Sequence, residues 1–152
     1  MKVKVEPRWD PESSPTFWIN QASRLLMRHF ERRLRPLDFG TAYFPVAQAL
    51  EDGGALLQKD LAERARVEQP TMAALVARME RDGLIAREPH PGDRRATLIS
   101  LSVTAKARLP AAKKGLREVA DRAMTGFSER ERATLMGLLR RVVDNLDAEE
   151  AA

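Results

Sequence analysis

LQKDLAERARVEQPTMAALVARMERDGLIAREPHPGDRRATLISL, residues Leu57–Leu101, decides the fold of this chain. Its apolar spacing predicts two short helices, Gln58–Ala65 and Gln69–Asp82, joined by a tight corner. The second helix is expected to stop at Gly83, because glycine readily adopts the left-handed conformation that closes a helix. One apolar stripe of that helix should face the core: Met72, Leu75, Val76 and Met79.

A hairpin is predicted directly after these helices. Leu84–Glu88 and Ala96–Leu101 alternate well enough to pair as strands, with a Pro-Gly turn between them. The tip of the hairpin carries Arg94 and Arg95. Two helices followed by a basic hairpin predict a winged helix-turn-helix, in which the second helix enters a DNA major groove and the hairpin, or wing, lies beside it.

Long helices are predicted on both sides of this stretch. Apolar residues recur every three or four positions over Ile19–Leu34, which predicts a helix of about 20 residues that Pro36 stops. Ser102 or Thr104 should cap a helix reaching about residue 126, and Ser128–Glu131 form a capping box before the last helix.

A shorter helix is expected from Thr41, its cap, to about Glu51, with an irregular start because Pro45 removes its first intrahelical hydrogen bond. The predicted fold class is therefore mainly α: a winged helix-turn-helix with a three-helix core and a two-stranded β wing. A single unit, 1–152, would contain the winged-helix part, 41–101, and dimerisation helices at 13–35 and 103–147. Their apolar stripes need partners, which favours a two-fold dimer.

The composition describes a globular protein with an aliphatic core, since 43% of residues are hydrophobic and only 5% aromatic. The absence of cysteine excludes disulfides, thiolate metal sites and cysteine nucleophiles. The N-terminus, MKVKVEPRWD, lacks the apolar run of a signal peptide, and the longest uncharged run, Phe39–Leu50, is too short to span a bilayer. We therefore expect a cytoplasmic protein without membrane contact.

Motifs for catalysis are missing from the sequence. It contains no Gly-rich phosphate loop, Ser-His-Asp arrangement or HExxH motif, and His29 and His90 are too few and too separated for a zinc site. The sequence therefore predicts neither an enzyme nor a cofactor or metal site.

In their order and spacing, these motifs resemble the MarR family of bacterial transcriptional regulators over about residues 14–147. The sharpest likeness lies in Gln58–Ala62, Gln69–Thr71, Met79–Ile85 and Asp93–Arg95. The resemblance implies a homodimer with interlocked terminal helices that binds a palindromic operator in double-stranded DNA, usually as a repressor. It also implies release by a small phenolic or aromatic acid that binds between the dimerisation and DNA-binding parts.

Three positions depart from the family pattern. The family usually has Thr or Ser as helix caps where this chain has Leu57 and Glu68, and often Arg where it has Ala74. Leucine cannot cap, which costs about 1 kcal/mol, and a carboxylate at Glu68 would repel DNA phosphates. With few long side chains to contact bases, groove shape gains weight in recognition.

Candidate DNA contacts lie off the apolar stripe of the second helix. Glutamine can bond an adenine edge, and threonine and alanine can contact a thymine methyl group. Lysine and glutamine at the start of the first helix can hold phosphate beside the helix N-terminus. Solvated surface is the alternative interpretation of these residues: Gln58, Lys59, Gln69, Pro70, Thr71, Ala73, Ala74 and Arg78.

The wing adds a second kind of contact. Either Arg94 or Arg95 is expected to enter a minor groove, while Asp93 holds the hairpin. Residues 57–101 contain eight Lys/Arg and seven Asp/Glu, so DNA binding must depend on how the charges are arranged. This near-neutrality keeps one alternative open, a winged-helix module that binds protein.

Candidates for an effector pocket are the ring-bearing residues Trp18, His29, Tyr43 and Phe44, with arginines of the first long helix holding a carboxylate. Ordinary packing is the interpretation we favour for these side chains.

Overall fold

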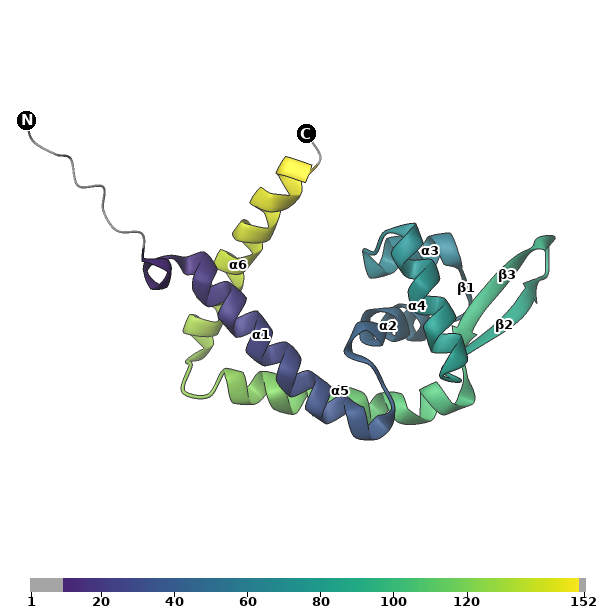
Figure 1. The fold of residues 1–152 in the computed structure, drawn as a ribbon, viewed down its shortest axis with the longest axis horizontal. Helices are drawn as coiled ribbons and strands as arrows, with labels where there is room; N and C mark the ends of the chain where they lie inside the picture. The colour runs from purple at the N-terminus through teal and green to yellow at the C-terminus, as the bar shows by residue number, and fades with distance from the viewer. Residues whose placement is uncertain (1–9, 151–152) are drawn as a thin grey trace, which may run out of the picture.

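A computed structural model describes residues 10–150 of the chain (Figure 1). The N-terminal residues considered for a signal peptide lie outside this range, apart from Asp10. The helices are α1 (Pro15–Leu34), α2 (Phe44–Gly53), α3 (Gln58–Ala65), α4 (Gln69–Arg81), α5 (Val103–Ala123) and α6 (Glu129–Glu150). The strands are β1 (Leu56–Leu57), β2 (Ile85–His90) and β3 (Asp93–Leu101). The predicted fold class, mainly α with a winged helix-turn-helix, is confirmed.

One hydrophobic core joins α2, α3, α4 and the sheet to the end of α1 and the first half of α5. Leu34, Leu61, Met72, Leu84 and Ile99 are all fully or almost fully buried in it. The predicted stripe of α4 accounts for three of its buried residues, Met72, Val76 and Met79, whereas Leu75 is half-buried. The core therefore lies in the part of the molecule that holds the helix-turn-helix.

The sheet has three antiparallel strands in the order β1-β3-β2, so the prediction of a two-stranded sheet was incomplete. Leu56 pairs with Ile99 and Leu57 with Leu98, which fastens the start of α3 to the central strand. The wing strands are also longer than predicted, because pairing continues to His90 and Asp93 across a turn of Pro91 and Gly92.

The start of α2 corrects the prediction of Thr41 as a cap. A 3-10 turn, Thr41–Tyr43, precedes the α-helix, and the Thr41 hydroxyl is buried without a hydrogen-bond partner among the described residues. Pro45 consequently falls in the first turn of α2, where a missing N–H costs nothing. The irregular start that the sequence predicted is therefore this 3-10 turn.

α1 and α5 lie side by side, and α6 extends away from them (Figure 1). The α6 cap matches the predicted box: Glu131 N–H donates to Ser128 Oγ, and Ser128 N–H donates to Glu131 Oε2. Between residues 10 and 150, no helix combines the length and apolarity that a bilayer crossing needs.

Ser102 connects the helix-turn-helix to α5. Its hydroxyl accepts a hydrogen bond from Ala105 N–H at 3.1 Å, which caps α5, and donates one to the Gly83 carbonyl at 2.6 Å. Gly83, with φ of 73°, is the predicted left-handed stop just beyond α4. One side chain therefore joins the end of α4 to the start of the long helix.

Candidate nucleic-acid interface

The exposed face of α4 is composed mainly of small side chains. Because Met72, Val76 and Met79 face the core, the opposite face of the helix is free. All six residues predicted on α4 are exposed: Gln69, Pro70, Thr71, Ala73, Ala74 and Arg78. Ala77 and Arg81, also exposed, extend this surface and were missed, although their spacing of three and seven from Ala74 places them on the same face.

The corner between α3 and α4 is tight. Arg66 has φ of 53°, a left-handed conformation that glycine usually supplies, and Val67 N–H donates to the Ala62 carbonyl. Glu68 and Leu57 occupy the cap positions of α4 and α3, and neither side chain caps its helix. Lys59 is exposed and Gln58 half-buried at the start of α3. The N–H groups that begin both helices therefore lack side-chain caps.

Hydrogen bonds within the wing shape its tip. Asp93 Oδ1 accepts from Arg95 N–H at 2.9 Å, and His90 Nδ1 accepts from Gly92 N–H at 3.0 Å. Arg94 and Arg95 are exposed. Because successive side chains of a strand point to opposite faces, only one of these arginines can face the side on which α4 lies.

An ion pair joins the wing to α4. Arg87 Nε of β2 lies 3.0 Å from both carboxylate oxygens of Glu80. Both side chains are largely exposed, so the pair adds little to stability. The pair links β2 to the last turn of α4 at the surface, while the buried Ile85 and Leu101 hold the strands to the core.

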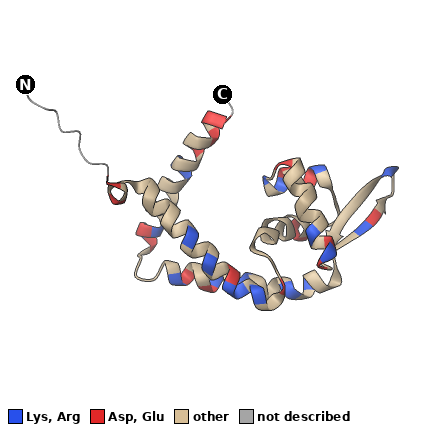
Figure 2. Cartoon of the chain, in the orientation of Figure 1, with Lys and Arg blue, Asp and Glu red and all other residues tan. Residues whose placement is uncertain are grey.

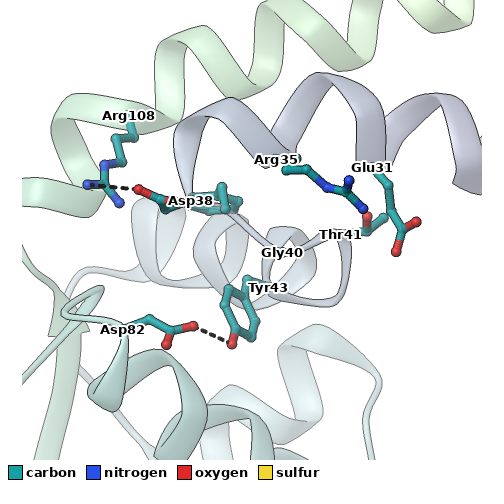
Figure 3. A pocket seen from close by; sticks show the side chains of 9 residues that line it. Glu31, Arg35, Asp38, Gly40, Thr41, Tyr43, Asp82 and Arg108 are labelled. Atoms are coloured by element: carbon teal, nitrogen blue, oxygen red, sulfur yellow. Dashed lines mark hydrogen bonds and ion pairs between the residues drawn. The ribbon is translucent and has the colours of Figure 1, made fainter.

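Tyr43 holds the C-terminal part of α4. Its hydroxyl donates to Asp82 Oδ2 at 2.7 Å (Figure 3). The Arg78 guanidinium lies 5.6 Å from the ring centre. Burial, followed by the nearby Asp82 carboxylate, raises the pKa of the Tyr43 hydroxyl above its ordinary 10.0. The hydroxyl therefore stays protonated at neutral pH and remains a donor.

The four predicted effector residues lie in different places. Trp18 is 54% exposed and its Nε1–H donates to the Glu12 carbonyl. His29 lines an apolar hollow between α1 and the α5–α6 corner, whereas Tyr43 borders a polar hollow with Arg35 and Arg108 (Figure 3). Phe44 lines a third hollow, between α1, α2 and α5. The structure thus does not bring these rings together.

The third hollow, hereafter the α1–α2–α5 cleft, has a volume of about 640 Å³. Its walls are mainly apolar, and Arg117 and Lys113 of α5 supply positive charge, the latter paired with Glu51. No local sequence pattern marks Arg117 or Phe30, because three separate elements form the cleft. It is lined by Met27, Phe30, Thr41, Phe44, Pro45, Gln48, Lys113, Leu116, Arg117 and Ala120.

Comparison with known proteins identifies the family. A sequence profile of the MarR family matches residues 37–96. An uncharacterized HTH-type transcriptional regulator of Mycobacterium leprae is 33% identical over 107 residues, which span 65% of this chain and 75% of that protein. The chain belongs to the MarR family. It is a DNA-binding transcriptional regulator.

Other relatives of this MarR-family chain match nearly its whole length. The HTH-type transcriptional repressor NicR of Pseudomonas putida is 26% identical, over 95% of this chain and 97% of NicR. The solved structure of Bordetella bronchiseptica BpsR, whose DNA binding is regulated by 6-hydroxynicotinic acid, is 22% identical with a TM-score of 0.78. It covers 91% of this chain and 99% of BpsR, so the long helices belong to the shared fold.

Proposed function

We propose that this MarR-family chain is a homodimeric repressor that binds a palindromic operator and is released by a small aromatic acid. The observation that carries the proposal is the juxtaposition of two exposed elements, the small-residue face of α4 and the arginine-tipped wing, which the Arg87–Glu80 ion pair links. α4 would enter the major groove, and Arg94 or Arg95 the neighbouring minor groove.

The dimer follows from α6. None of its 22 residues is buried, yet one stripe is apolar, with Met136, Leu138, Leu139, Val143 and Leu146 exposed. A helix with an apolar stripe needs a surface to cover it. A second copy offers the same stripe, and two-fold pairing would place two α4 helices about 34 Å apart, one turn of DNA.

The α1–α2–α5 cleft is the proposed effector site. Its apolar walls, including Phe30 and Phe44, suit an aromatic ring, and Arg117 suits a carboxylate. BpsR, with its 6-hydroxynicotinic acid, provides a precedent for this chemical class. Release requires only that the acid bind the DNA-incompetent dimer more tightly than the DNA-competent one.

Binding to promoter DNA upstream of the gene for this protein is the test. The wild type should prefer that duplex over unrelated DNA, with an affinity that falls steeply as salt rises. The double variant Arg94→Ala/Arg95→Ala should bind at least about tenfold more weakly and show a shallower salt slope. Arg28→Ala/Arg32→Ala removes the same charge from exposed positions on α1 and serves as the matched control. Equal affinity for all duplexes that survives high salt would contradict the proposal.

A further inference from the structure

Tyr43 lies where the 3-10 turn Thr41–Tyr43 meets α2, and it is only 4% exposed. Its ring packs edge-on against Phe39, with centroids 6.4 Å apart, and supports the Arg78 guanidinium on another side. Its hydroxyl is bonded to Asp82, one turn further along the chain than Arg78. Tyr43 thus contacts Arg78 of α4 and Asp82, the residue that follows the helix. Figure 3 shows the second contact.

Two residues close to Tyr43 in the chain face the α1–α2–α5 cleft and not α4. Thr41 and Phe44 both line the α1–α2–α5 cleft, and the buried Thr41 hydroxyl has no partner among the described residues. On another side the ring lies close to Gly40, where an added Cβ would be 3.3 Å from it, and it also borders the polar hollow that contains Arg35 and Arg108. A molecule in the cleft would press on Thr41 and Phe44, and the Tyr43 ring, which the neighbouring polar hollow leaves room to move, would shift with them.

The contacts to α4 have a defined chemical effect. A ring beneath a guanidinium restricts the side chain to few orientations before any partner arrives, so less conformational entropy is lost on binding. Asp82 lies four residues after Arg78, a spacing at which a carboxylate can pair with an arginine. The Tyr43 hydroxyl donates to one oxygen of Asp82 and so competes with that pairing. Arg78 is left exposed and oriented, with its charge available to a phosphate.

We propose that Tyr43 is a positioning residue for DNA binding: its ring presets Arg78 for the operator phosphate, and its place between Thr41 and Phe44 makes that presetting depend on the state of the α1–α2–α5 cleft. This inference rests on the proposed function and deepens it. Tyr43 is the side chain that would couple the cleft to Arg78 of α4. It can be replaced while the cleft and Arg78 both remain.

A double-mutant cycle tests the first half. Operator affinity is measured for Arg78→Ala, Tyr43→Leu, Tyr43→Phe and the pairs. Arg78→Ala should weaken binding about tenfold in the wild type but no more than about twofold beside Tyr43→Leu. Tyr43→Phe keeps the ring but releases Asp82, and should lower the Arg78 effect less than Tyr43→Leu does. If Tyr43 serves only to stabilise the fold, Arg78→Ala costs the same factor in every background, and the inference is overturned.

Filling the cleft tests the second half without any ligand. Ala120→Phe places a ring in the cleft from α5, and Ala111→Phe adds the same ring at an exposed α5 position outside it. Ala120→Phe should weaken operator binding several-fold in the wild type and hardly at all beside Arg78→Ala. An equal loss in both backgrounds overturns the link. Should Tyr43→Leu fail to fold, this comparison decides alone. Failure of the wild type to prefer its operator would instead count against the proposed function.

Discussion

The helix-turn-helix half buries its apolar residues, whereas α6 leaves its apolar stripe exposed. Leu61, Met72, Val76 and Leu84 have no exposed surface at all, whereas Leu146 of α6 is 60% exposed. The first region completes its core within one chain. The second has an apolar stripe that residues 10–150 leave uncovered, and in the proposed dimer its stability would depend on protein concentration. Under the proposed function, folding and assembly therefore depend on different parts of the chain.

Two acidic substitutions on α6 should have the largest effect. Leu139→Glu with Val143→Glu, one turn apart on the exposed apolar stripe, should yield a monomer of 17.1 kDa in sedimentation. Operator affinity should fall by about a hundredfold or more, because the second α4 is no longer tethered to the first. Arg141→Glu, on the opposite face of α6, is the control and should remain dimeric. If the Leu139→Glu/Val143→Glu variant remains dimeric, α6 does not serve assembly and the contrast with the helix-turn-helix half is wrong.

Truncation of a core residue should act differently from truncation on α6. Leu61→Ala should lower the free energy of unfolding by about 3 kcal/mol at low and high protein concentration alike, since Leu61 is fully buried within its own chain. Leu146→Ala should matter mainly at low concentration, where the dimer dissociates. Chemical denaturation at two concentrations separates them. Equal losses for Leu146→Ala at both would place its partner inside the chain.

The corner of the helix-turn-helix carries strain even though its core is complete. Arg66 has φ of 53°, so Arg66→Gly should raise the free energy of unfolding by about 0.5 to 1 kcal/mol. Arg66→Ala removes the same charge but keeps the Cβ atom, and should give no such gain. Urea denaturation compares the two variants; a gain shared by both would point to charge instead of backbone conformation.

The smallest effect concerns Tyr43, the sole tyrosine of the chain. Its pKa is raised in the folded state by burial, so folding favours the protonated hydroxyl. This contribution to stability is complete below the unfolded pKa, near 10, and is lost as pH rises through the higher folded value. Phenolate absorbance reports the titration of Tyr43 alone. Tyr43→Phe should lack this part of the alkaline loss of stability, and an unshifted titration would contradict the burial.

Local sequence patterns predicted the elements whose causes are local. The bounds of α3, the left-handed Gly83, and the box of Ser128 and Glu131 follow from spacing and capping within a few residues. β1 was missed because its two residues pair with β3 some forty positions later, a contact that no short window contains. Thr41 failed as a cap because a 3-10 turn moved the start of α2 past it.

The candidate site was predictable to a similar extent. The exposed face of α4 follows from one helical period, although Arg81 on the same face was overlooked. The contacts of Arg78 with Tyr43 and of Arg87 with Glu80 join separate elements and leave no trace in the spacing. The effector candidates were chosen for their rings, and Tyr43, Phe44 and His29 line three different hollows. The type of a side chain does not predict which hollow it lines.

The Ser102 hydroxyl, shared between Gly83 and the start of α5, has a consequence for gene regulation. In the proposed dimer, this residue and the core residues Ala105 and Leu109 of α5 together hold α4 relative to the long helix, and so influence how far apart the two α4 helices sit. A change at Ser102 leaves both the core and the apolar stripe of α6 intact. Substitutions at this position would therefore change which separation of half-sites the dimer prefers.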